Sequence, residues 1–153
     1  GPSSVDRGRR GVKHHLLVDA TGIPLSWSVS AGNRHDVTQL ALLLDRIPPI
    51  RGVRGRPRRR PQVLYGDRAY DYRSHRGELR RRGITARIAR RGTDHGSRLG
   101  RHRWPVEQTI ALIHRYKRLL VCFDRTLESH QAWLDIACCL ICWRPLAKAH
   151  SFC

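Results

Sequence analysis

The chain is poor in negative charge. Its 153 residues include only 12 Asp and Glu against 30 Lys and Arg, so the formal net charge is +18 and the isoelectric point is about 11.4. This imbalance excludes an acidic protein and favours a polyanionic partner, above all nucleic acid, because basic side chains contact phosphates and release counterions. Lys itself is scarce, with three residues. Arg binds phosphate bidentately, although a GC-rich genome also favours Arg codons over Lys codons.

Long apolar runs are also absent. Apolar runs such as residues 40–44 and 119–123 are far too short to cross a bilayer, which argues against a membrane-buried protein. The length and the 40% of hydrophobic residues still suffice for one domain with a core. The five cysteines do not form a disulfide framework, because their number is odd and three share one apolar segment. Cys138 and Cys142 lie one helical turn apart, but no histidine stands beside them, and we interpret them as core residues rather than metal ligands.

The first half of the chain predicts a hairpin, a helix and a loop. Residues 13–19 and 23–30 are β-prone segments joined by a turn, and the alternation in the second predicts that Ile23, Leu25, Trp27 and Val29 share one face. A helix capped by Asn33 or Asp36 should then run to about Ile47, with Val37, Leu40, Leu43 and Leu44 buried. Residues 48–61, rich in Pro, Gly and Arg, predict an exposed basic loop.

The second half predicts an α/β arrangement. A strand over 63–67, a basic helix over 70–82 closed by Gly83 and a strand over 84–89 favour a parallel crossover unit. A glycine-rich basic loop should follow over 90–103, then a helix over 104–120 with Pro105 in its first turn. The last predicted helix spans 128–146, with a core face and two tryptophans in the core: Trp133, Ile136, Ala137, Leu140, Ile141 and Trp143.

Two of the few acids occupy informative positions. Asp67 ends a buried strand, at the sheet edge where active sites gather, and Glu107 follows in a predicted helix. Two carboxylates brought together in this way suit Mg²⁺, which prefers hard oxygen ligands and can activate a phosphate for transfer. The alternatives remain open: Asp67 could cap the following turn, and Glu107 could be a favourable charge near a helix N-terminus.

Several ordered segments carry a resemblance to a known family. The stretches GVKHHLLVDATGIPL, AGNRHDVTQL, VLYGDRAYD and RHRWPVEQTIALIHRYKRL are similar to those of DDE transposases of the bacterial insertion sequence 5 type, within the insertion sequence 4 superfamily. The resemblance covers nearly the whole chain. It implies a ribonuclease-H-like mixed sheet with flanking helices. It also implies three acids that hold two Mg²⁺ ions, DNA cleavage and strand transfer at transposon ends, and a cytoplasmic, nucleoid-associated bacterial protein.

The resemblance assigns roles to particular residues. Asp67 matches the second catalytic Asp and metal ligand, and Glu107 matches the catalytic Glu and metal ligand. The larger family surrounds this Glu with a Tyr–Arg–Glu–Lys signature, of which Arg103 fits the Arg. The chain departs from the signature at Gly100, where the family has Tyr, and at His114, where it has Lys, although Arg115 and Lys117 stand close by.

The first catalytic Asp has no match. In the family it lies on a first, central strand, whereas residues 1–12 contain no apolar strand and Asp6, in a polar stretch, is a poor substitute. Asp19 at the hairpin turn remains the less favoured alternative as a replacement acid. We therefore expect residues 1–147 to form a partial catalytic domain lacking its central strand, with a tail over 148–153. Such a chain would be inactive alone and would complete its sheet with the upstream transposase segment or a second copy.

The charge and the resemblance together predict DNA as the partner, both transposon ends and target. The basic residues expected to contact it are Arg56, Arg58, Arg59, Arg60, Arg68, Arg90, Arg91, Arg101, Arg103, Arg115 and Lys117. The alternative function is a non-catalytic DNA-binding relic or regulator of transposition, which shares the DNA contacts but not the need for Asp67 and Glu107.

Overall fold

The computed structural model describes residues 11–92 and 100–150, with the backbone alone at positions 37, 101 and 148–150. The described residues fall into two compact units, one drawn from residues 1–34 and 105–153 and the other from residues 35–104. Each unit combines one two-stranded sheet with helices, so the chain is a mixed α/β protein. Within the described part of the chain, no helix is long and apolar enough to cross a membrane.

The first unit is built on the predicted hairpin, which the structure confirms. Strands β1 (Val12–Val18) and β2 (Pro24–Ala31) pair antiparallel, from Val12 opposite Ala31 to Val18 opposite Pro24. Asp19 organises the turn: its Oδ1 accepts hydrogen bonds from the amides of Thr21 at 2.8 Å and Ile23 at 2.9 Å. Gly22 takes a φ of 88°, a conformation that side chains disfavour.

The two faces of β2 differ in burial. Trp27 and Val29 pack against the core of the unit but are only half-buried, whereas Ser26, Ser28 and Ser30 are buried on the opposite face. The predicted alternation is therefore present, but the apolar face is not the more buried one. A serine side chain ends two heavy atoms from the backbone, so neighbouring residues cover it easily, while a tryptophan ring extends past them.

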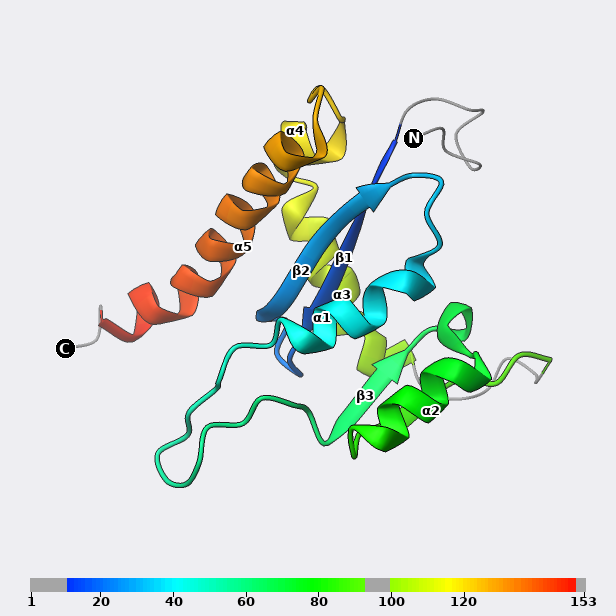
Figure 1. Cartoon of the computed structure of the whole chain (residues 1–153). Coiled ribbons are helices and arrows are strands. Elements are labelled where there is room, and N and C mark those ends of the chain that lie inside the picture. The colour runs from blue at the N-terminus through cyan, green and yellow to red at the C-terminus, as the bar shows by residue number, and fades with distance from the viewer. Residues whose placement is uncertain (1–10, 93–99, 151–153) are drawn as a thin grey trace. The chain divides into compact units, whose positions relative to one another are not determined.

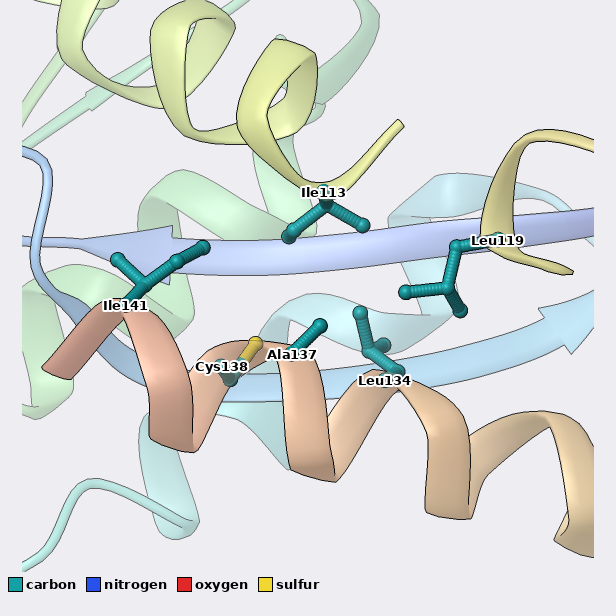
Figure 2. Packing of buried hydrophobic residues seen from close by; sticks show 6 residues of the cluster. All are labelled: Ile113, Leu119, Leu134, Ala137, Cys138 and Ile141. Carbon is teal, nitrogen blue, oxygen red and sulfur yellow. The ribbon is translucent and has the colours of Figure 1, made fainter. Parts of the chain in front are cut away.

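The core of the first unit lies where the end of α3 (Gly100–Ile113), the short α4 (Lys117–Leu120) and the long α5 (Leu127–His150) meet. Figure 2 shows the side chains of α5 pointing toward those of α3 and α4 in a cluster of six: Ile113, Leu119, Leu134, Ala137, Cys138 and Ile141. The prediction that Cys138 is a core residue is confirmed, and burial raises the pKa of its thiol to about 12.

Helix α5 lies along β2 (Figure 1), and hydrogen bonds join the two elements. The indole Nε1 of Trp27 donates to Asp135 at 2.6 Å, and the backbone N–H of Val29 donates to the side chain of Gln131 at 2.9 Å. Gln131 in turn donates to Asp135 at 2.7 Å. Side chains of α5 therefore satisfy the indole N–H of Trp27 and the backbone N–H of Val29 on β2.

The apolar face predicted for α5 is only partly correct. Ala137 and Ile141 are buried as expected, but Trp133, Ile136 and Leu140 are 39%, 52% and 43% exposed, and Trp143 is 61% exposed. The helix is apolar nearly all round, so its sequence does not reveal which side meets the core.

The second unit contains the predicted crossover. Strands β3 (Val63–Gly66) and β4 (Thr85–Ile88) pair in parallel, with α2 (Arg73–Arg81) between them in the chain, and Gly83 follows α2 with a φ of 67°. The helix expected from residue 33 or 36 is shorter and begins with the 3₁₀ turn η1 (Asp36–Gln39) before α1 (Leu40–Asp45). Gln39 precedes α1 without a side-chain cap, so the predicted Asn33 or Asp36 cap is wrong, while the burial of three leucines is confirmed: Leu40, Leu43 and Leu44.

The helix predicted over residues 104–120 differs most from the structure. It begins earlier, at Gly100, so Pro105 lies inside α3 rather than in its first turn, and it ends at Ile113. A separate turn of helix, α4, then starts after Tyr116. Residues 100–103, expected in a loop, are helical, and the rest of that loop beyond Gly92 falls outside the described residues.

Three histidines from distant parts of the chain meet in the first unit. His14 on β1 lies with its Nε2 2.9 Å from Nε2 of His130 on α5 and its Nδ1 3.4 Å from Nε2 of His114. Asp124 contacts Nδ1 of His130 at 2.9 Å. Burial, followed by the neighbouring His130 and His114, lowers the pKa of His14 from 6.5 to about 4. His14 is therefore neutral at pH 7, and the contact between the His14 and His130 rings links β1 to α5.

Acidification is predicted to destabilise the fold through His14. Its pKa is lower in the folded chain than in the unfolded chain, so the unfolded chain takes up more protons below pH 6.5. Stability should fall as pH drops from 6.5 to 4, by about 3 kcal/mol at most. Denaturant unfolding followed by circular dichroism across this range measures the loss.

The matched variants are His14→Leu and His35→Gln, the latter at an exposed histidine. The His14 variant should show a flatter pH profile, and the His35 variant should keep the wild-type profile. An unchanged slope in His14→Leu contradicts the assignment.

Candidate functional site

The second unit carries a basic pocket. It has a volume of about 500 Å³ and lies between one side of α2 and the segment that follows β4. Five guanidinium groups and a single carboxylate line it, so the pocket suits an anion: Asp71, Arg73, Arg76, Gly77, Arg80, Arg90 and Arg91.

Helical spacing explains how the arginines gather. Arg73, Arg76 and Arg80 recur at intervals of three and four residues, which places them on one side of α2. Gly77 stands among them with open space where a Cβ would project. Arg90 and Arg91 come from the far end of the crossover unit, just after β4. The fold therefore assembles the pocket from two basic stretches of the sequence.

Asp71 fixes the position of two of these arginines. Its Oδ1 accepts from Nε of Arg76 at 2.7 Å, and its Oδ2 accepts from the backbone N–H of Arg91 at 2.8 Å. The Arg91 amide and then the Arg76 side chain lower the pKa of Asp71, so the carboxylate stays charged. Asp71 does not cap α2, because Tyr72 occupies that position without a side-chain cap. Asp71 instead joins the two halves of the pocket.

Arg91 extends this connection toward the end of β3. Its guanidinium donates to the carbonyls of Arg68 and Ala69, each at 3.2 Å, and lies 4.2 Å from the centre of the Tyr72 ring. Arg68 and Ala69 belong to the 3₁₀ turn η2 (Arg68–Tyr70), which directly follows Asp67. The basic pocket and the predicted catalytic acid are thus connected through one arginine.

Asp67 stands where β3 ends and η2 begins. Its Oδ1 accepts from the backbone N–H of Arg68 at 2.6 Å and from Nη1 of Arg103 at 2.8 Å. The structural alternative, a cap on the following turn, is therefore present in the structure. The side chain is nevertheless 58% exposed, so its carboxylate remains accessible to a ligand.

Glu107 lies about two turns into α3 and is exposed, so its predicted place in the first turn of a helix is wrong. It belongs to the first unit and Asp67 to the second. Within the described residues, no three His, Cys, Asp or Glu side chains are grouped closely enough to hold a metal ion. The oxygen chemistry of Asp67 and Glu107 suits a divalent cation, but at Asp67 a cation would compete with Arg103.

The remaining predicted DNA contacts are mostly at the surface. Arg58 forms an antiparallel bridge with Ile50, with both N···O distances 2.8 Å, so the exposed loop has some regular structure, and Arg60 donates to the carbonyl of Arg82. Arg68 and Arg103 are half-buried, and the side chain of Arg101 falls outside the described part. The others are exposed: Arg56, Arg58, Arg59, Arg60, Arg90, Arg91, Arg115 and Lys117.

Sequence reasoning missed three residues of the pocket, Arg73, Arg76 and Arg80. The signal was present, because these arginines are spaced for one side of a helix that we did predict to be basic. Their partnership with Arg90 and Arg91 depends on the parallel pairing of β3 and β4, which brings the ends of the crossover together.

Comparisons with known proteins confirm the broader part of the resemblance, the DDE transposase domain. The family model "Transposase DDE domain" matches residues 2–143. The chain is also 52% identical over 149 residues to a Burkholderia cepacia protein named "Putative transposase for insertion sequence element IS402", an alignment that covers 97% of this chain and 71% of that protein. No solved structure matches the chain significantly. The chain belongs to the DDE transposase domain family, and this membership supports a role in transposition.

Proposed function

We propose that the chain binds transposon DNA through its basic pocket and contributes Asp67 and Glu107 to the active site of a ribonuclease-H-like DDE transposase of the insertion sequence 5 type. The observation that carries this proposal is the link from the pocket to Asp67. Arg91 lines the pocket, is fixed by Asp71 and donates to both residues that follow Asp67. A phosphate backbone in the pocket would therefore run close to a carboxylate at the end of β3.

Basic and acidic residues have different roles in this proposal. The pocket arginines bind and orient the DNA backbone without reading its sequence, because phosphates are the same at every base pair. Asp67 and Glu107 would hold Mg²⁺, which supplies activation of the attacking oxygen and stabilisation of the leaving oxygen. Arg103, which contacts Asp67 at 2.8 Å, would turn from that carboxylate toward a phosphate when the cation binds.

The proposal includes a contribution from another segment. β1 pairs with β2 and β3 with β4, so each sheet that the structure describes has two strands, a size that is marginal alone. A ribonuclease-H-like sheet needs further strand pairing, supplied by the upstream transposase segment or a second copy. The same source would supply the third acid, so the chain alone would not cleave DNA.

A second function, DNA binding without catalysis in a relic or regulator, is favoured by one observation. Asp67 already serves as the cap of η2 and as the partner of Arg103. In these two roles Asp67 would maintain the fold of the chain and its affinity for DNA without binding a metal ion.

DNA binding should depend on the pocket. The double variant Arg73→Gln with Arg80→Gln removes two phosphate contacts, so the slope of log K against log salt should become less steep by about 1.8 for duplex DNA. Fluorescence anisotropy over a salt series measures the slope.

The matched control is Arg34→Gln with Arg125→Gln, which changes the net charge equally at exposed positions outside the pocket. It should leave the slope near the wild-type value. Equal effects of both double variants would show that net charge, not the pocket, drives binding.

The metal assignment predicts a separate loss. When the upstream segment completes the protein, Asp67→Asn and Glu107→Gln should each lower Mg²⁺-dependent strand cleavage by about 100-fold or more, because each removes a charged oxygen ligand. DNA affinity should remain within about twofold of wild type. Asp45→Asn, which removes a carboxylate that contacts Arg82, serves as the control and should retain activity.

Full cleavage by the Asp67 and Glu107 variants would overturn the catalytic assignment. If the completed wild-type protein binds DNA but never cleaves it, the regulator function is the correct one.

A further inference from the structure

The loop between α1 and β3 is a second basic surface of the second unit, separate from the pocket. Residues 51–60 contain six arginines and no acid, and all ten are exposed. Figure 1 shows the loop running out from the end of α1 and returning to β3. None of these residues lines the basic pocket, so phosphate binding in the pocket gives the loop no role.

The base of the loop is fixed, and its tip is not packed against the unit. Ile50 and Arg58 exchange two backbone hydrogen bonds of 2.8 Å, and the guanidinium of Arg60 donates to the carbonyl of Arg82, just after α2. Residues 51–57 lie between the paired residues, and we refer to them as the tip. Val53, within the tip, is 104% exposed, so the tip makes little contact with the rest of the unit.

The sequence of the tip combines two arginines with a glycine and a proline. Gly55 lies between Arg54 and Arg56 with a φ of 93° and open space where a Cβ would project. The backbone is therefore slender at this point, and the conformation is one that side chains disfavour. Pro57 has a fixed φ and restricts Arg56, the residue before it, to extended conformations. Less conformational freedom then has to be lost when the tip binds a partner.

A slender cationic tip fits the minor groove of A·T-rich DNA. This groove is about 6 Å wide, too narrow for a helix, and in A-tracts it narrows further and becomes more negative, which attracts arginine. Arg enters such a groove more readily than Lys because a guanidinium group is less strongly hydrated than an ammonium group. In G·C pairs the amino group of guanine occupies the groove and adds a donor that repels cationic donors.

The spacing of the two arginines also fits the groove. In an extended segment, residues two apart lie on one face about 6.6 Å from each other, close to the rise of two base pairs, about 6.8 Å. Gly55 can straighten from its φ of 93° without a steric penalty, because it has no Cβ. Arg54 and Arg56 can then enter the same groove two base pairs apart, with no side chain between them to obstruct the approach.

We propose that the tip of this loop, with Arg54 and Arg56 on either side of Gly55, enters the minor groove of A·T-rich DNA and discriminates against G·C pairs. This inference rests on the proposed function only in taking DNA as the partner. It goes further, because the pocket arginines contact phosphates that are the same at every base pair, whereas the tip distinguishes one kind of base pair from the other.

Binding of the full chain to three duplexes of equal length tests the groove and the preference. One duplex contains an A·T core, one a G·C core and one the same G·C core with inosine in place of guanine. Inosine lacks the amino group in the minor groove but keeps the major-groove acceptors of guanine. The A·T and inosine duplexes should therefore bind alike, at least about tenfold more tightly than the G·C duplex. Fluorescence anisotropy measures the three affinities.

The double variant Arg54→Lys with Arg56→Lys separates groove binding from charge. It keeps the net charge, so the slope of log K against log salt should stay at the wild-type value, while the A·T preference should fall to about twofold or less. The matched control is Arg58→Lys with Arg59→Lys, which makes the same change at exposed positions of the same loop beyond the tip. It should keep the full preference.

Equal affinity for the three duplexes overturns the inference, and so does an A·T preference that persists in the tip variant. If the inosine duplex binds like the G·C duplex, the chain does not read the minor groove, and the inference is again wrong. Failure of the proposed function gives a different result: the Arg73 and Arg80 pocket variant would bind with an unchanged salt slope, while the A·T preference and its loss in the tip variant would remain. Absence of binding to all three duplexes would overturn both.

Discussion

Repulsion between arginines is the constraint on which the structure of this chain depends. With 30 basic side chains and 12 acidic ones, most carboxylates must hold basic groups or backbone donors in place. Asp71 does so for both halves of the pocket, and Asp45 and Glu78 together hold Arg82, where α2 ends. Such contacts are weak individually at the surface, but they decide which arginines approach one another and which point outward. The basic pocket exists because one carboxylate in its wall offsets part of the repulsion among five guanidinium groups.

Other carboxylates act on the backbone instead. Asp19 accepts two amide hydrogen bonds at the hairpin turn, and Asp67 accepts one at the start of η2. These contacts fix the points at which β1 and β3 end. In the second unit, the same turn presents the carbonyls of Arg68 and Ala69 to Arg91. A local turn preference thereby helps to define the position of the Arg91 side chain in the wall of the basic pocket.

The sequence predicted the elements whose signals are local. Alternation identified β2, and the apolar strands on either side of a basic helix identified the parallel pair β3–β4. The sequence did not predict features of the structure that depend on packing between distant residues. Residues 100–103 look like a basic loop yet form the first turn of α3, where Arg103 contacts a residue far away in the chain. The orientation of α5 was equally hidden, because a helix that is apolar on all sides has no single face that its sequence marks as buried.

The candidate site was also only partly predictable from the sequence. Its geometry is compatible with both proposed functions, catalysis and DNA binding alone. Asp67 could be found from its place after an apolar strand, but its contact with Arg103 could not, because that arginine lies 36 residues away in the chain. The contact gives Asp67 a structural role that a binding protein would use. It also offsets the charge of an exposed carboxylate that is connected to the basic pocket through Arg91. If the pocket binds a phosphate backbone, as proposed, a bare negative charge at Asp67 would repel DNA. A divalent cation at Asp67 would perform the same neutralisation and release Arg103 to the phosphate, so the arginine contact is compatible with catalysis as well as with binding alone.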